Sequence, residues 1–179
     1  ALEDGWSYDA LLVGQDTDSD LAVLKIEAKG LTPAEFGDSD ALTVGDPAIA
    51  IGNPLGEQFR GTMTDGIISA INRDVYVDGR TMVLLQTNAA LNSGNSGGAL
   101  INIYGQVVGI TTLKMMSYGD TIEGLGFAIP TSSAKVIVDG LIEQGRITGR
   151  PTIGITVLPL TKEQAAGYGL THGLQIQAL

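Results

Sequence analysis

The sequence contains no cysteine, and its 179 residues include a single histidine, His172. The absence of cysteine excludes disulfide bonds, thiolate metal sites and cysteine nucleophiles. Basic residues are also scarce, because ten Lys and Arg stand against twenty Asp and Glu and leave a formal net charge of −10. An acidic surface of this kind repels phosphate backbones, so we expect no nucleic-acid partner.

Long apolar segments are missing as well. No stretch approaches the ~20 apolar residues that span a bilayer, and no charged-then-apolar signal segment opens the chain. The sequence starts at Ala1 inside a strand-like segment and ends abruptly at residues 175–179. We therefore expect a piece of a longer protein, in which other segments supply any signal or anchor.

Glycine is abundant instead, with 25 residues, about twice its usual share of ~7%. The glycines are dispersed among short runs rich in Val, Ile, Leu and Thr, a pattern typical of short strands joined by tight turns. Regularly spaced short strands favour a β-barrel or a β-sandwich. The predicted strands cover residues 10–14, 21–27, 47–52, 66–72, 81–87, 99–103, 106–113 and 126–129.

One segment near the end departs from the β pattern. Hydroxyl residues at 131–133 offer N-caps, apolar residues then recur at helical spacing, and Gly145 supplies a stop. The pattern predicts one amphipathic helix over about residues 132–144. Residues 146–151 are typical of a linker. The remainder, residues 152–179, has two strand-like pieces, near residues 152–157 and 173–177, and one helical turn near residues 161–166, and it is too short to bury its own core.

The most specific chemical feature is Gly94-Asn95-Ser96-Gly97-Gly98. A hydroxyl nucleophile that attacks a carbonyl needs backbone N–H donors aimed at the developing oxyanion, and glycines allow the sharp backbone that presents both. Taken alone, the same letters also fit a glycine-rich hairpin loop with a solvated serine. A phosphate-binding loop is excluded, because its lysine-containing signature does not occur.

Five ordered segments, rather than the serine motif alone, carry a family likeness. They are residues 86–100 around Ser96 (QTNAALNSGNSGGAL), 16–26 (DTDSDLAVLKI), 48–56 (AIAIGNPLG), 66–70 (GIISA) and 124–130 (GLGFAIP). In these segments the chain resembles the HtrA (Deg) family of trypsin-like serine proteases, over essentially its whole length.

The resemblance implies a mainly β fold. It predicts a trypsin-like double β-barrel whose first barrel is incomplete here, followed by one C-terminal amphipathic helix and the start of a PDZ domain. The implied domains are residues 1–149 for the protease and 150–179 for a truncated PDZ. The resemblance implies no cofactor and no metal.

By the same resemblance, Ser96 is the nucleophile and Asp20 is the triad carboxylate that orients the catalytic histidine. A turn aspartate at a strand start is the plainer interpretation of Asp20. A calcium loop is a third, because Asp16, Asp18, Asp20 and Glu27 fall at its positions 1, 3, 5 and 12. We reject that loop, because its sixth position requires glycine and is Leu21.

The base of the triad is missing from this sequence. The family places its histidine before the aspartate, which falls upstream of Ala1, whereas His172 follows Ser96 and lies in the C-terminal piece. We expect His172 to be a surface residue. Because serine is a weak nucleophile without a base, we expect these 179 residues alone to be inactive and the parent protein to supply the base.

The resemblance also assigns a substrate site. It implies an oxyanion hole formed by the backbone N–H groups of Gly94 and Ser96 with help from Asn95. The implied substrate pocket favours small aliphatic side chains such as Val or Ala, although its two leucines could equally belong to an ordinary core. Family members commonly have Asp where Asn88 stands, so a charge is lost near the pocket. The predicted pocket residues are Asn88, Leu91, Leu125 and Gly126.

Two functional hypotheses follow. The first is a serine endopeptidase that degrades unfolded polypeptides through an acyl-enzyme, in a homotrimer of the bacterial cell envelope, anchored through a segment outside this chain, with a PDZ that binds peptide C-termini. The second is a non-catalytic, PDZ-containing peptide-binding module. The intact glycine set around Ser96 favours the first, because such a loop is expected where an oxyanion is bound.

Overall fold

The computed structural model describes residues 5–54, 59–77, 80–117, 120–148 and 156–178. The chain divides into two compact units, Ala1–Ile147 and Thr148–Leu179. Their border lies close to the domain boundary predicted after residue 149.

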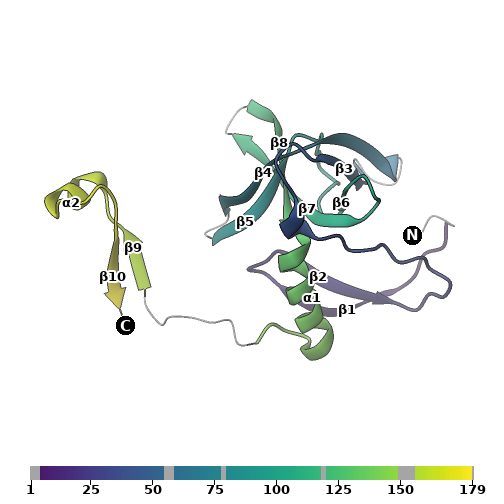
Figure 1. The fold of residues 1–179 in the computed structure, drawn as a ribbon. Coiled ribbons are helices and arrows are strands. Elements are labelled where there is room, and N and C mark those ends of the chain that lie inside the picture. Colours follow the sequence, from purple (N-terminus) through teal and green to yellow (C-terminus); the bar gives the residue numbers. More distant parts are fainter. Residues whose placement is uncertain (1–4, 55–58, 78–79, 118–119, 149–155, 179) are drawn as a thin grey trace. The chain divides into compact units, whose positions relative to one another are not determined.

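A closed antiparallel barrel forms most of the first unit, with strand order β3-β4-β5-β8-β7-β6 (Figure 1). The mainly β prediction is confirmed. Strand β4 runs further than the predicted residues 66–72, because it begins at Thr62 in pairing with β3 and continues to Val77 in pairing with β5. The strands are β3 (Pro47–Gly52), β4 (Thr62–Val77), β5 (Arg80–Thr87), β6 (Ala99–Ile101), β7 (Val107–Ser117) and β8 (Asp120–Pro130).

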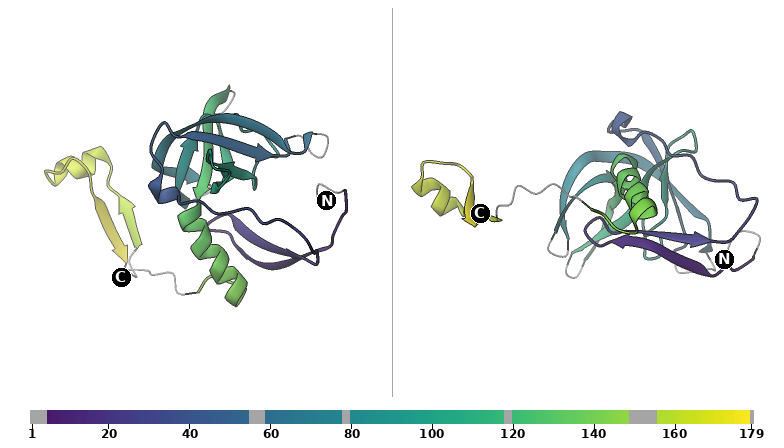
Figure 2. Two further views of the ribbon diagram at one scale, coloured as in Figure 1. Left: turned by 45° about the vertical axis from the view of Figure 1, so that its right-hand side comes forward. Right: turned by 90° about the horizontal axis from the view of Figure 1, so that it is seen from below.

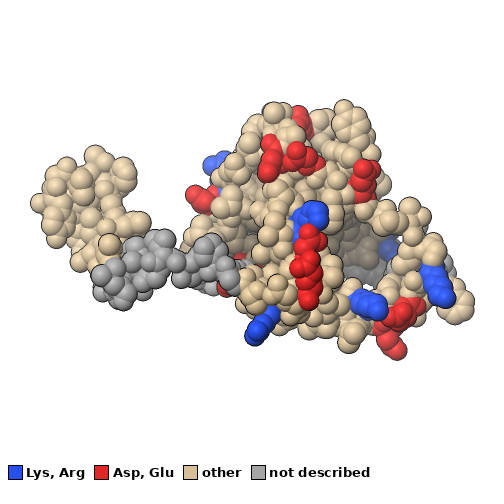
Figure 3. Space-filling model, turned by 60° about the horizontal axis from the view of Figure 1, so that its bottom comes forward, with Lys and Arg blue, Asp and Glu red and all other residues tan. Residues whose placement is uncertain are grey.

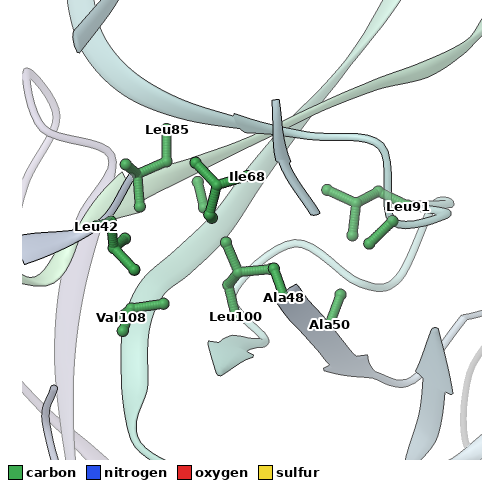
Figure 4. Close-up of a cluster of buried hydrophobic side chains, with 10 residues drawn as sticks. Leu42, Ala48, Ala50, Ile68, Leu85, Leu91, Leu100 and Val108 are labelled. Atoms are coloured by element: carbon green, nitrogen blue, oxygen red, sulfur yellow. The ribbon is translucent and has the colours of Figure 1, made fainter. Parts of the chain in front are cut away.

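Buried side chains from every strand fill the barrel interior (Figure 4). Alternate residues of a strand face the same side, so Ala48 and Ala50 of β3 are both 1% exposed. Burying a leucine such as Leu100 contributes about 1.5–3 kcal/mol. The loop between β5 and β6, which contains Ser96, therefore begins and ends on a packed scaffold. The interior cluster is Leu42, Ala48, Ala50, Ile68, Leu85, Ala89, Leu91, Leu100, Val108 and Ala128.

Strands β1 (Ala10–Asp16) and β2 (Leu21–Ile26) form a separate antiparallel hairpin, and helix α1 (Thr131–Gln144) packs against it (Figures 1 and 2). Gly14 lies at a bulge of β1, where an added Cβ would stand 2.6 Å from the carbonyl oxygen of Gly145. Leu21 joins a second apolar cluster that includes Phe127 of β8 and Ala134 of α1. The hairpin is thus held to the barrel by the packing of Leu21 in β2 and by helix α1.

Helix α1 confirms the predicted segment and its glycine stop. Gly145 is left-handed, with a φ of 71°, and its N–H donates to the Leu141 carbonyl at 2.9 Å. The expected cap differs, because the residue before the helix is Pro130, which makes no side-chain cap bond. Ser39, in the short helix η1 (Ser39–Ala41), instead accepts the Ser132 N–H at 3.0 Å. The first turn is therefore capped from a distant part of the chain.

The second unit contains β9 (Thr156–Pro159), α2 (Lys162–Gly167) and β10 (Leu174–Ala178), with β9 and β10 antiparallel. Thr161 caps α2 in a capping box with Gln164, as a helix start of this composition predicts. Of the two strand-like pieces expected after the linker, the first, near residues 152–157, falls partly outside the described residues. His172 is exposed, and its ring nitrogen Nδ1 lies 2.9 Å from the hydroxyl of Thr171.

The surface carries charges of both signs. On the face drawn in Figure 3, Lys and Arg lie singly among acidic side chains rather than in a patch. One such pair, Lys135 and Asp139, is spaced i,i+4 on α1 at 2.7 Å. Across the described ranges, no helix is long and apolar enough to cross a membrane.

Candidate active site

Ser96 lies in a tight loop between β5 and β6, held on both sides by backbone hydrogen bonds. The Asn95 N–H donates to the Asn92 carbonyl at 3.0 Å, and the Gly97 N–H donates to the Thr111 carbonyl at 2.7 Å. Gly94 and Gly97 have φ values of 100° and 84°, in the region that favours glycine. The glycines that the sequence placed around Ser96 are therefore required by the backbone itself.

The side chain of Ser96 is exposed, and its hydroxyl donates to the Thr112 carbonyl at 2.7 Å. Beside it, the backbone N–H groups of Gly94 and Ser96 donate to no group in the part of the chain that the structure describes. An open cavity of about 330 Å³ is lined by both residues together with Gly52, Asn53 and neighbouring backbone. The loop thus combines a hydroxyl and two free N–H donors at one cavity.

Asn95 occupies a different position from its two neighbours. It is 3% exposed, and its backbone N–H donates to the Asn92 carbonyl. Its side-chain Nδ2 lies 3.5 Å from the Ala90 carbonyl oxygen, to which it donates. Its carbonyl accepts the Gly98 N–H and the Thr111 hydroxyl. Asn95 therefore secures the loop from within rather than lining the cavity.

Two glycines allow this loop to approach strand β3. A Cβ on Gly98 would overlap the carbonyl oxygen of Ile51, and one on Gly52 would stand 2.5 Å from Asn95 Oδ1. At Gly52 the added atom would also stand 2.8 Å from the Cα of Asn95, so at both sites it meets backbone, and neither accepts a larger residue without displacing the loop.

Asp20 ends the turn between β1 and β2 with a φ of 59°, an uncommon conformation that Asp adopts more readily than most residues. Its Oδ2 accepts the Thr112 hydroxyl at 2.6 Å. Its Oδ1 lies 3.9 Å from Nη2 of Arg80, and the Asp20 side chain is 50% exposed. One oxygen is thus fixed, and the carboxylate keeps an open side on which a further donor can bind.

The turn itself is stabilised by Asp16. Its carboxylate accepts the Ser19 N–H at 2.9 Å and also the Ser19 hydroxyl. A side-chain oxygen thus takes the place of a backbone acceptor for the N–H three residues further on, which closes the turn. In the described ranges, no group of three His, Cys, Asp or Glu residues could hold a metal ion.

Thr112 of β7 joins the two predicted catalytic residues, and no sequence motif points to it. Its hydroxyl donates to Asp20, and its carbonyl accepts from Ser96. The side chain is 7% exposed. The bond to Asp20 spans 92 residues of sequence, so it is not visible in any local motif.

The four predicted pocket residues lie together. Asn88, Leu91, Leu125 and Gly126 line one cavity of about 240 Å³ with Ala89, Ala90, Asn92 and Gly124. A larger cavity of about 540 Å³, between β5, the β1–β2 turn and α1, contains neither Ser96 nor Asp20 in its wall. His172 belongs to the other unit.

Comparisons with known proteins place this geometry in a family. The family model described as "Trypsin-like peptidase domain" matches residues 1–110. The chain is 49% identical over 178 residues to "Serine protease Do-like HtrB" of Bacillus subtilis (strain 168), covering 97% of this chain and 38% of that protein. It is 47% identical over 169 residues to "Probable periplasmic serine endoprotease DegP-like" of Chlamydia muridarum (strain MoPn / Nigg), covering 94% and 33%.

A solved structure agrees with these relatives. "HtrA-type protease AlgW with decapeptide" has a TM-score of 0.86 and 42% identity, covering all of this chain and 55% of that chain. The chain belongs to the trypsin-like peptidase family. Within it, the chain is similar to the HtrA-type proteases and spans 38% and 33% of the length of the two curated relatives.

Proposed function

We propose that this chain carries the nucleophile and the carboxylate of an HtrA-type serine endopeptidase. The observation that supports this function most directly is the loop at Ser96, where an exposed hydroxyl stands beside two backbone N–H groups without partners in the described chain. Thr112 connects this loop to Asp20. These donors and the hydroxyl face one cavity, the arrangement that would stabilise an oxyanion formed next to Ser96.

The proposed reaction follows from these positions. The Ser96 Oγ forms a bond to the substrate carbonyl carbon while its proton passes to an imidazole. The carbonyl oxygen becomes an oxyanion, which the N–H groups of Gly94 and Ser96 stabilise, with Asn95 holding the loop. Collapse of this intermediate breaks the peptide C–N bond, the leaving amine takes the proton from the imidazolium, and water then hydrolyses the acyl-enzyme.

The imidazole is proposed to come from a segment upstream of Ala1, in keeping with the resemblance. Asp20 offers it a carboxylate of which one oxygen is fixed by Thr112 and the other faces Arg80 at 3.9 Å. We expect the imidazole Nδ1–H to take the place of this long contact. His172 is an exposed residue of the second unit and has no part in the proposal.

The wider biology is proposed by analogy with the relatives. A relative described as periplasmic supports an extracytoplasmic location. We propose unfolded polypeptides as substrates, a homotrimer and a membrane anchor in the whole protein, and a PDZ that binds peptide C-termini. The 240 Å³ cavity at Leu91 and Leu125 is the proposed pocket for the residue before the cleaved bond.

A fluorophosphonate probe tests the enzyme hypothesis. In the full-length protein, the probe should label Ser96, and Ser96→Ala should abolish both labelling and casein cleavage. The alternative, a non-catalytic peptide-binding module, predicts no labelling while casein binding persists in both forms. That result would overturn the proposal.

A further inference from the structure

Asn88 is held in one orientation at the end of β5. Its Oδ1 accepts the Ile67 N–H of β4 at 2.8 Å. Of the two ends of the Asn88 amide, only the oxygen can accept a hydrogen bond from an N–H. This bond therefore fixes which end of the amide faces the sheet. The sheet is also closed there, since a Cβ on Gly66 would stand 2.5 Å from Oδ1. The Nδ2 group is consequently the end of the amide left to bind a ligand.

The cavity that Asn88 lines is confined, and its wall combines the apolar side chains of Leu91 and Leu125 with polar groups, Asn92 among them. Leu91 is 5% exposed, and a Cβ on Gly126 would stand 2.7 Å from its Cδ1, so the wall on that side is already filled. Gly124 lies opposite, where a Cβ would approach that of Asn88 to 3.9 Å. Asn88 is itself exposed, and its Nδ2 donates to no group among the described residues. A small cavity of mixed polarity thus contains the uncommitted Nδ2 donor of Asn88.

We propose that Asn88 determines specificity in this pocket by donating a hydrogen bond to the substrate side chain. The inference rests on the proposed protease function. The substrate class is then small residues that carry an oxygen acceptor, namely Asn, Asp and Thr, in addition to Val and Ala. A neutral donor accommodates a carboxylate as well as an amide, because either presents an oxygen to it.

A carboxylate at the same position would behave differently. One of its oxygens would still accept the Ile67 N–H, so the local backbone would keep its partner. Its second oxygen would place a negative charge and no donor in the cavity. Two like charges about 4 Å apart at a protein surface repel strongly enough to lower binding by roughly ten- to a hundredfold. Asn88→Asp is therefore a matched variant. It keeps the hydrogen bond from the Ile67 N–H and replaces the Nδ2 donor by a charged acceptor.

The experiment compares peptides that differ only in the residue before the cleaved bond, which is Asn, Asp or Val. In the full-length protease, kcat/KM for Asn and Asp is divided by that for Val in each variant. We expect wild type to cleave the Asn and Asp peptides with ratios within about fivefold of each other. Asn88→Asp should lower the Asp ratio about tenfold or more relative to the Asn ratio. Equal Asp-to-Asn ratios in the two variants would overturn the inference.

A second measurement does not depend on catalysis. In the present chain, labelled with ¹⁵N, the side-chain NH₂ resonance of Asn88 should shift when a product peptide ending in Asn or Asp is added, and shift less with one ending in Val. The Ile67 amide reports on whether the variant keeps its fold contact. Loss of all cleavage with these shifts intact would count against the proposed enzyme but not against the role of Asn88, and shifts equal for all three peptides would refute that role.

Discussion

Thr112 offers the sharpest perturbation of the site, because valine has the same shape and lacks the hydroxyl. Thr112→Val removes the 2.6 Å bond to the Asp20 carboxylate and leaves the carbonyl that accepts from Ser96. Hydrogen bonds to charged groups contribute about 1.5–3 kcal/mol. Because half of the Asp20 side-chain surface is exposed, water can replace the lost donor, and we expect a loss of about 1 kcal/mol.

Two assays measure the two parts of this effect. Thermal unfolding of the present chain should show a Tm lower by about 3 °C, as expected for a domain of this size. In the full-length protease, kcat should fall about tenfold with little change in KM, because a carboxylate free to rotate orients the imidazole less well. A tenfold loss corresponds to about 1.4 kcal/mol at the transition state.

The control is Thr112→Ser, which keeps the hydroxyl and should recover most of both quantities. If valine and serine have the same effect on Tm and on kcat, the hydroxyl does not position Asp20 and the argument is wrong. If KM rises while kcat holds, Thr112 acts on substrate binding instead.

Three further predictions concern the loop, the turn and a surface carboxylate. Gly98→Ala should destabilise the chain by about 1–3 kcal/mol in chemical unfolding, because its Cβ overlaps β3 backbone. Asp16→Ala should lower kcat in the full-length protease severalfold, because it removes the acceptor that holds the turn before Asp20. By NMR titration, the pKa of Asp46 should lie below that of an ordinary aspartate, because the Thr43 N–H and then its hydroxyl donate to the carboxylate. A carboxyl with a lowered pKa stabilises the fold above its ordinary titration range and loses that contribution as the pH falls through the folded pKa.

Each of these has a matched comparison. Gly167→Ala, where an added Cβ meets nothing within 4 Å, should cost far less than the loop variant. Asp16→Asn keeps a side-chain oxygen and should restore kcat in part, so equal losses in the two variants would argue against the turn. Thr43→Val removes the hydroxyl alone and should raise the pKa of Asp46 toward its usual range, while an unchanged titration would contradict the assignment.

Local patterns were sufficient for most of the fold. Short runs rich in Val, Ile, Leu and Thr predicted the strands that form the barrel, and helical spacing with Gly145 predicted α1. Both signals lie within a few neighbouring residues, so they can be recognised without knowledge of the tertiary structure. Strand ends were less predictable, because Arg73 and Asp74 have little strand preference of their own and belong to β4 through pairing with β5.

The candidate site was predictable only in part, for the same reason. The glycines around Ser96 predict a sharply turning backbone from the sequence alone. The structure also brings the predicted pocket residues to one cavity. Thr112 and Arg80 approach Asp20 from strands far along the chain. Such contacts depend on how the barrel closes, which no short motif records. The roles of Ser96 and Asp20 stay predictions until the labelling and kinetic experiments are done.

The cap that Ser39 provides for α1 has a consequence for the order of folding. The Ser39 hydroxyl and the start of the helix are 93 residues apart in the sequence, so the cap forms only after most of the first unit has folded. A fourteen-residue helix is marginal by itself in water, and this one has no side-chain cap from its own preceding residue. The free peptide 130–145 should therefore be largely unstructured, and α1 should acquire hydrogen-exchange protection late, after the barrel.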